Sequence, residues 1–119
     1  MYLHQTKSHC VIMCYDITDK KSFEFLKETY GKELELYRNE KPDCVFVLVG
    51  TKLDLQTTKR EVSREEGQKY AKEHGFRFME VSSQTGENVK ELFYITVDVM
   101  LQKIVNREVG EEYYLKPKP

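Results

Sequence analysis

Two short polar segments of the chain follow apolar runs and carry residue types that could bind a ligand. The first follows the run Val45–Gly50 (VFVLVG) and contains Thr51, Lys52 and Asp54, so a cation and a carboxylate lie two positions apart. An ionised carboxylate only accepts hydrogen bonds, and Asp54 could therefore bind adjacent N–H donors on one edge of a planar base. The aliphatic stem of Lys52 could lie along such a base or brace a neighbouring loop.

The second segment is the loop Ser82–Asn88 (SSQTGEN), which follows a shorter apolar run. The backbone amides from Ser82 to Gly86 could donate to a carbonyl oxygen such as O6 of guanine, whose N1 and N2 edge suits a carboxylate. A single Lys-x-Asp is usually an ordinary turn with solvated charges. Its occurrence together with the serine-rich loop, each after a buried strand, favours a binding site.

The runs Cys10–Ile17, Cys44–Val49 and Arg77–Val81 predict three buried strands. The first two are apolar on both faces, which is typical of parallel strands covered on both sides. Helical segments follow each run, so the order is strand, helix, strand, helix, strand, helix. Right-handed crossovers then place helices on both faces of a parallel sheet. Ligands of such sheets bind beyond the carboxyl ends of the strands, where both polar segments lie.

Apolar residues at helical spacing predict three amphipathic helices. The middle helix begins at Ser63, which forms a capping box with Glu66, and ends near His74 before Gly75. The apolar positions of the first helix are Phe23, Leu26, Tyr30, Leu34 and Tyr37, and those of the last are Val89, Leu92, Phe93, Val97, Met100 and Ile104.

The composition excludes several other classes of protein. The chain has 119 residues, which argues for one domain. Charged residues make up 33% and hydrophobic residues 39%, a composition that fits neither a membrane protein nor a disordered chain. Acidic residues number 20 and basic residues 19, so nothing predicts nucleic acid or an anionic membrane as a partner. Cys10, Cys14 and Cys44 form no CxxC pair and are expected to be buried, reduced thiols.

The segments VGTKLDL and EVSSQTGENVKELF together resemble the guanine-recognition pair of Ras-superfamily small GTPases. CVIMCYDITDKKSFEFL resembles the strand and helix that precede this pair, especially in the Rab branch. The resemblance implies a P-loop-NTPase-like, Ras-type G domain, a three-layer α/β sandwich of which this chain holds the C-terminal half with a parallel three-stranded sheet. Residues 1–9 are then expected to be a leader that ends a switch-II-type helix, 10–106 a partial G domain, and 107–119 a flexible tail.

The resemblance also implies a role for each candidate residue. Asp54 would read the N1 and N2 donors of guanine, and Lys52 would pack on the base. The backbone from Ser82 to Gln84 would contact O6, which selects guanine over adenine. Thr51 stands where asparagine is commoner in the family, and the short link from Asp54 to the next helix favours the Rab branch over the Rho branch. The predicted guanine-binding residues are Thr51, Lys52, Asp54, Ser82, Ser83 and Gln84.

The phosphate half of such a site is not found in the sequence. No segment matches G-x-x-x-x-G-K-[ST], and no aspartate has a glycine three positions later. The family implies GTP or GDP and Mg²⁺, but no residue can be assigned as a magnesium ligand and none as catalytic. We therefore expect weak nucleotide binding and no GTP hydrolysis by this chain alone, since phosphate contacts supply most of the affinity.

The first interpretation is a Rab-like small GTPase, a GTP/GDP-binding switch in vesicle traffic, or a fragment of one, with effector or regulator proteins as partners. We expect it to be intracellular and cytoplasmic, with endomembrane association only for a longer form, since no cysteine after Cys44 could carry a lipid anchor. An alternative is a non-enzymatic interaction module that uses a helical face with Phe23 and Tyr30. A third is a flavodoxin-like domain, which gives no reason for the serine-rich loop.

Overall fold

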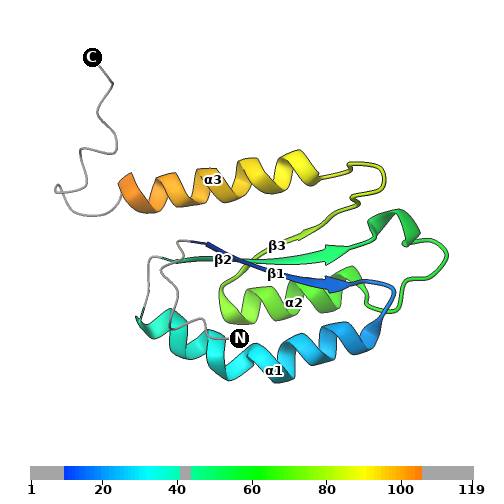
Figure 1. Cartoon of the computed structure of the whole chain (residues 1–119), viewed down its shortest axis with the longest axis horizontal. Coiled ribbons are helices and arrows are strands. Elements are labelled where there is room, and N and C mark those ends of the chain that lie inside the picture. The colour runs from blue at the N-terminus through cyan, green and yellow to red at the C-terminus, as the bar shows by residue number, and fades with distance from the viewer. Residues whose placement is uncertain (1–9, 41–43, 106–119) are drawn as a thin grey trace, which may run out of the picture.

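The structure is a computed structural model that describes residues 10–40 and 44–105 (Figure 1). The predicted leader 1–9 and the predicted tail 107–119 lie outside the described residues. The elements are β1 (Cys10–Asp16), α1 (Lys20–Glu40), β2 (Val45–Thr51), the 3₁₀ helix η2 (Leu53–Leu55), α2 (Arg64–His74), β3 (Arg77–Glu80) and α3 (Val89–Val105). The predicted alternation of strands and helices is confirmed, and each predicted strand shifts by one or two residues at its ends.

The three strands form one parallel sheet in the order β1, β2, β3. The register pairs Asp16 of β1 with Thr51 of β2, and Gly50 of β2 with Glu80 of β3. The last residues of all three strands therefore lie side by side. The loops that follow them meet at one end of the sheet, as the sequence predicts.

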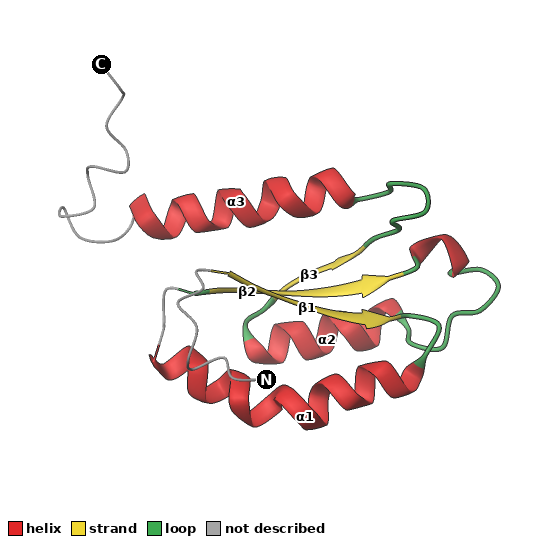
Figure 2. Ribbon diagram, viewed as in Figure 1, coloured by secondary structure: helices red, strands yellow, loops and turns green. Residues whose placement is uncertain are grey.

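Helices cover both faces of the sheet, which gives three layers (Figures 1 and 2). Helices α1 and α2 lie on one face, and α3 lies on the other. The core under α1 and α2 contains the buried residues Val11, Met13, Tyr15, Ile17, Phe23, Leu26, Leu34, Tyr37, Cys44, Phe46, Leu48, Val62, Ala71 and Phe76. The core under α3 is smaller and contains Val45, Val47, Val49, Val81 and Leu92.

The face under α1 and α2 is packed as the apolar spacing predicts. Phe23, Leu26, Leu34 and Tyr37 are buried, while the side chain of Tyr30 lies outside the described residues. The ring of Phe23 lies 4.7 Å from that of Tyr15, between ring centroids. Aromatic packing of this kind joins α1 to the sheet.

The prediction that both faces of the first strand are covered is wrong. Burial alternates along β1, with Val11 only 6% exposed and its neighbour Ile12 41% exposed. Cys14 points to the same open face as Ile12 and is exposed. The physical reason is position: β1 is an edge strand of the described sheet, and α3 packs mainly over β2.

The prediction for the apolar face of the last helix is only partly correct. Leu92 is buried, but Phe93 and Val97 are exposed on α3, and the side chain of Ile104 lies outside the described residues. Thr96 is buried instead and donates a hydrogen bond to the carbonyl of Leu92 at 2.7 Å. A narrow stripe of α3 meets the sheet, because α3 packs on β2 and leaves the neighbouring stripe uncovered.

Local signals in the middle of the chain are confirmed. Ser63 accepts from the N–H of Glu66 at 3.0 Å, and the Glu66 carboxylate accepts from the N–H of Ser63 at 3.2 Å. This backbone hydrogen bond from Ser63 lowers the pKa of Glu66. Gly75 ends α2 with φ at 71°, a left-handed conformation that favours glycine.

Among the described residues no helix is long and apolar enough to cross a membrane.

Candidate functional site

The turn after β2 carries the predicted lysine and aspartate and is fixed at both ends. Lys52 adopts a left-handed conformation with φ at 66°, which turns the chain sharply out of the strand. The N–H of Leu53 then donates to the carbonyl of Val81 at 3.0 Å. This bond ties the turn to the loop after β3, so the two predicted segments form one structure.

A side-chain hydrogen bond connects Asp54 to Ser82. The hydroxyl of Ser82 donates to Oδ1 of Asp54 at 2.7 Å, and Ser82 is buried while Asp54 is exposed. The N–H of Ser82 donates to the carbonyl of Glu87 at 3.1 Å and is already occupied. The Ser82 hydroxyl thus orients the Asp54 carboxylate, and the Ser82 N–H, which was predicted to contact a ligand, has a partner within the chain.

The loop that begins at Ser82 turns around the same hydroxyl. The N–H of Thr85 donates to Oγ of Ser82 at 3.1 Å, and the N–H of Gly86 donates to its carbonyl at 2.8 Å. Gly86 has φ at 83°, which a residue with a side chain rarely adopts. Ser83 and Gln84 lie exposed, and within residues 10–40 and 44–105 their N–H groups make no hydrogen bond. These two amides remain as donors for a ligand.

Lys52 is held by a residue that the sequence reasoning did not select. Its Nζ lies 2.8 Å from Oδ2 of Asp16, at the end of β1. Thr18 donates to the other carboxylate oxygen through its N–H at 2.8 Å and its hydroxyl at 2.6 Å. Burial alone would raise the pKa of Asp16, but the hydrogen bonds from Lys52 and Thr18 outweigh it and lower that pKa. The hydrogen bond to Asp16 raises the pKa of Lys52.

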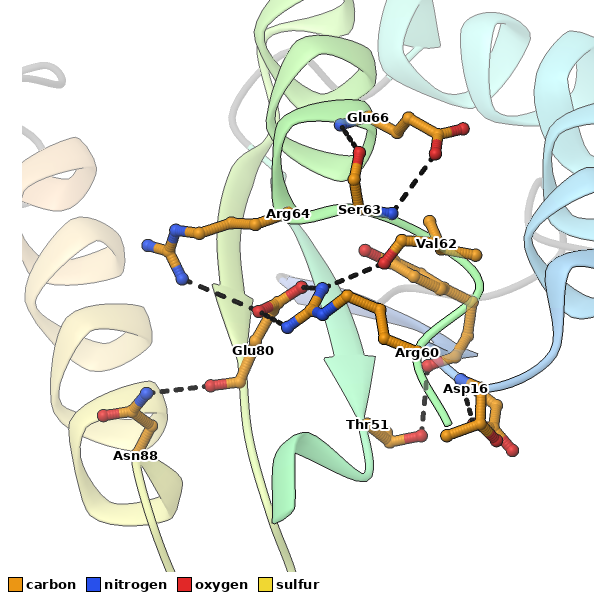
Figure 3. Close-up of polar contacts among 11 residues, drawn as sticks. Asp16, Thr51, Arg60, Val62, Ser63, Arg64, Glu66, Glu80 and Asn88 are labelled. Atoms are coloured by element: carbon orange, nitrogen blue, oxygen red, sulfur yellow. Dashed lines mark hydrogen bonds and ion pairs between the residues drawn. The ribbon is translucent and has the colours of Figure 1, made fainter. Parts of the chain in front are cut away.

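Thr51 has a structural partner. Its hydroxyl donates to the carbonyl of Tyr15 at 3.0 Å, across the β1–β2 pair (Figure 3). The threonine therefore fixes the end of β2 beside β1, immediately before the turn with Lys52. The pairing of Asp16 with Thr51 in the sheet register could have indicated that Asp16 lies beside this turn.

A second ion pair joins Arg60 to Glu80 at the end of β3, and the sequence reasoning also missed it (Figure 3). Nη1 and Nη2 of Arg60 lie 2.7 Å and 2.8 Å from the two carboxylate oxygens of Glu80. This hydrogen-bonded pairing raises the pKa of Arg60. The side-chain amide of Asn88 donates to the carbonyl of Glu80 at 2.9 Å. The available signal was a glutamate at the end of a predicted buried strand, since a buried charge needs a partner.

A shallow pocket of about 370 Å³ lies beside these loops. Its lining includes Arg60, Arg64 and Glu80 but not Lys52 or Asp54. The predicted base-reading groups therefore lie on the open end of the sheet and not in this pocket.

The described residues hold no cluster of side chains typical of a protein metal site. Within residues 10–40 and 44–105, no group of three or more histidine, cysteine, aspartate or glutamate side chains could hold a metal.

Comparison with known proteins supports the family assignment. The Ras family model matches residues 1–102. The chain is 43% identical over 99 residues to Ras-related protein rab-39 of Caenorhabditis elegans, a match that covers 82% of this chain and 41% of that protein. It is 41% identical over 115 residues to Ras-related protein Rab-12 of Mus musculus, covering 92% of this chain and 46% of that protein. It is also 43% identical over 83 residues to Ras-related protein RABC2a of Arabidopsis thaliana, covering 70% and 39%.

The matches thus cover less than half the length of each of these relatives. The parallel sheet with helices on both faces is consistent with a P-loop GTPase-like fold. The family model covers most of the chain, and the relatives named above are all Ras-related, two of them Rab proteins by name. The chain therefore belongs to the Ras family and is Rab-like.

Proposed function

We propose that this chain supplies the guanine-recognition part of a Rab-like GTP/GDP-binding switch in vesicle traffic. The observation that carries the proposal is the hydrogen bond from Ser82 to Asp54 at 2.7 Å. It joins the two predicted segments and orients an exposed carboxylate beside the N–H groups of Ser83 and Gln84. Acceptors and donors thus lie together at the end of the sheet, as recognition of one base edge requires.

The chemistry of this arrangement favours guanine. The Asp54 carboxylate accepts from guanine N1–H and from its 2-amino group, and the Ser83 or Gln84 amide donates to O6. Adenine has no N–H at position 1, no 2-amino group, and a donor in place of O6. Each of its groups would leave a protein partner without a hydrogen bond, which costs affinity. Lys52 stands beside the base, with its charge held by Asp16.

Phosphate binding and hydrolysis require groups beyond the described residues. The sequence has no G-x-x-x-x-G-K-[ST] segment, and the matched relatives are more than twice as long as the segments that this chain matches. This chain alone therefore binds a guanine nucleotide weakly, with a Kd of roughly millimolar order. The complete switch, its effectors and its endomembrane association belong to a protein that contains both halves.

For the alternative, a non-enzymatic interaction module, Phe23 was expected to face a partner. Phe23 is only 2% exposed and packs against Tyr15, so it is not available to a partner. The exposed apolar residues of α3, such as Phe93 and Val97, are the observation that would support this function.

The test is a titration of the ¹⁵N-labelled chain with guanosine monophosphate (GMP) and, separately, with adenosine monophosphate (AMP). Binding is monitored by the NMR chemical shifts of the backbone amides. GMP should shift the amides of Leu53, Asp54, Ser83 and Gln84, and AMP should not. Asp54→Asn should abolish the GMP shifts. Asp98→Asn, which changes an exposed carboxylate on α3, is the matched control and should keep them. Equal responses to GMP and AMP, or shifts confined to other regions, would refute guanine recognition.

A further inference from the structure

We infer that Arg60 and Glu80 are positioning residues whose ion pair holds the two base-reading loops in register. The base-reading loops are residues 51–55, after β2, and residues 82–88, after β3. The expected effect on GMP affinity rests on the proposed function. The positioning itself is a property of the chain without ligand and can be tested separately.

The ion pair has a fixed geometry, with a buried carboxylate and a partly exposed guanidinium. Glu80 is 1% exposed, and both of its carboxylate oxygens meet the guanidinium of Arg60, at 2.7 Å and 2.8 Å. Two parallel charge-assisted hydrogen bonds restrict orientation as well as distance. The same guanidinium also donates to the carbonyl of Val62 at 2.9 Å, which fixes the segment that leads into α2 (Figure 3).

Glu80 connects to both base-reading loops. Its carbonyl accepts from Asn88, the last residue of the second loop, at 2.9 Å. The residue after it, Val81, donates its N–H to Gly50 at 2.8 Å and accepts from Leu53 of the first loop at 3.0 Å. Arg60 belongs to the segment that continues from the first loop. The ion pair therefore links the segment after the first loop to the end of β3, from which the second loop and the Ser82–Asp54 hydrogen bond begin.

Packing alone does not explain the presence of this pair. A buried ion pair often contributes no more stability than apolar residues of similar volume, because both charges lose their hydration. The neighbouring Arg64 makes a useful comparison. It lies 3.8 Å from the same carboxylate, is half exposed, and makes no bidentate contact. Arg64 therefore supplies positive charge near Glu80 without a fixed geometry, whereas Arg60 supplies both, and the positioning role is assigned to Arg60.

The first test measures amide hydrogen exchange by NMR in the chain without ligand. The double variant Arg60→Gln, Glu80→Gln removes both charges and so leaves no unpaired buried charge. It should exchange about tenfold faster than the wild type at the amides of Leu53 and Thr85, while the amides of β2 keep their rates. Arg64→Gln is the matched control and should leave the Leu53 and Thr85 rates unchanged. Arg60→Lys keeps the positive charge but cannot make the two parallel hydrogen bonds to Glu80. It replaces the double variant in this test if the double variant does not fold.

The second readout is the affinity for GMP, measured where circular dichroism shows each variant to be folded. It should fall several-fold in the Arg60 and Glu80 variants and stay unchanged in Arg64→Gln. Wild-type exchange rates at Leu53 and Thr85 in the folded variants would overturn the inference. If the wild type does not bind GMP but the exchange rates change as expected, the proposed function fails while the positioning role stands.

Discussion

The two faces of the sheet are covered by helices to different extents. One face lies under α1 and α2, and the other lies under α3. On the first face, every inward residue of β1 is buried, and aromatic rings join α1, α2 and the sheet. On the second, α3 covers β2, while Ile12 and Cys14 of β1 and Phe93 and Val97 of α3 stay exposed. The same three strands thus have one closed face and one partly open face.

This difference shows that the candidate site does not depend on a closed α3 face. The hydrogen bonds that form the site come from the ends of β2 and β3 and from the turns after them. The buried residues at these strand ends, Val49 and Val81, belong to the core under α3, and polar contacts to Asp16 and Glu80 also hold the strand ends. We therefore expect changes of buried residues on the closed face to affect the whole domain, and changes at the exposed positions of the open face to affect little beyond association.

The largest expected effect comes from a matched pair of phenylalanines. Phe23→Ala, on the closed face, should lower the free energy of unfolding by about 3–5 kcal/mol, because it removes a buried ring that packs on Tyr15 and Tyr70. Phe93→Ala, where the ring is 56% exposed, should change it by less than about 0.5 kcal/mol. Urea denaturation followed by circular dichroism measures both values. Equal losses for the two variants would contradict the comparison.

Two glycines test how tightly the closed face is packed. A Cβ on Gly67 of α2 would collide with the Tyr15 hydroxyl and lie 2.7 Å from the ring of Phe78, so Gly67→Ala should destabilise by about 1–3 kcal/mol. A Cβ on Gly31 of α1 would meet nothing within 4 Å, so Gly31→Ala should stabilise by about 0.5–1 kcal/mol. Thermal unfolding of the two variants should move in opposite directions. A stable Gly67→Ala protein would mean looser packing than the structure shows.

The ion pair of Asp16 and Lys52 predicts a smaller, pH-dependent effect. The pKa of folded Asp16 lies below its unfolded value of about 3.9, so its ionised form stabilises the fold above that pH. This stabilisation is lost as the pH falls through the folded pKa. Asp16→Asn should cost about 0.5–1 kcal/mol at neutral pH and little at low pH.

The measurement is the urea midpoint at neutral pH and near pH 3, with Asp98→Asn as the control carboxylate. A gap between Asp16→Asn and the wild type that stays constant over this range would show that ionisation of Asp16 is not the cause.

The smallest effect on stability is expected on the open face. Ile12→Lys changes an exposed residue of an edge strand and should alter the free energy of unfolding by less than about 0.5 kcal/mol. It should reduce concentration-dependent association, because a charge on an edge strand hinders pairing with another chain. Sedimentation velocity at several concentrations measures this. Val11→Lys, which places the charge one position earlier on the closed face, should unfold the protein instead.

Local and periodic features of the fold could be predicted from the sequence. The capping box of Ser63 and Glu66 and the glycine that ends α2 depend on a few neighbouring residues, and they are confirmed. Helical spacing correctly selected the buried residues of α1 that the structure describes. It failed for Phe93 and Val97, because spacing shows that a helix has an apolar side but not how much of that side a single strand can cover.

Some residues of the candidate site could be predicted from the sequence, and some of their contacts could not. Asp54 and the loop at Ser82 could be found because polar residues after buried strands meet at one end of a parallel sheet. The occupied N–H of Ser82 could not be foreseen, since it depends on how the loop folds back to Glu87. The contacts of Arg60 with Glu80, and of Lys52 with Asp16, join residues far apart in the chain and became evident only once the register of the strands was known.

The most direct test of guanine recognition is the ratio of the affinities for GMP and inosine monophosphate, which differ only in the 2-amino group. If Asp54 reads that group, the wild type should bind GMP about tenfold more tightly, since the analogue leaves one carboxylate hydrogen bond unmade. Asp54→Asn should lose GMP binding together with this preference. A wild-type ratio near one, measured by NMR titration, would contradict the assignment of this end of the sheet as a guanine site.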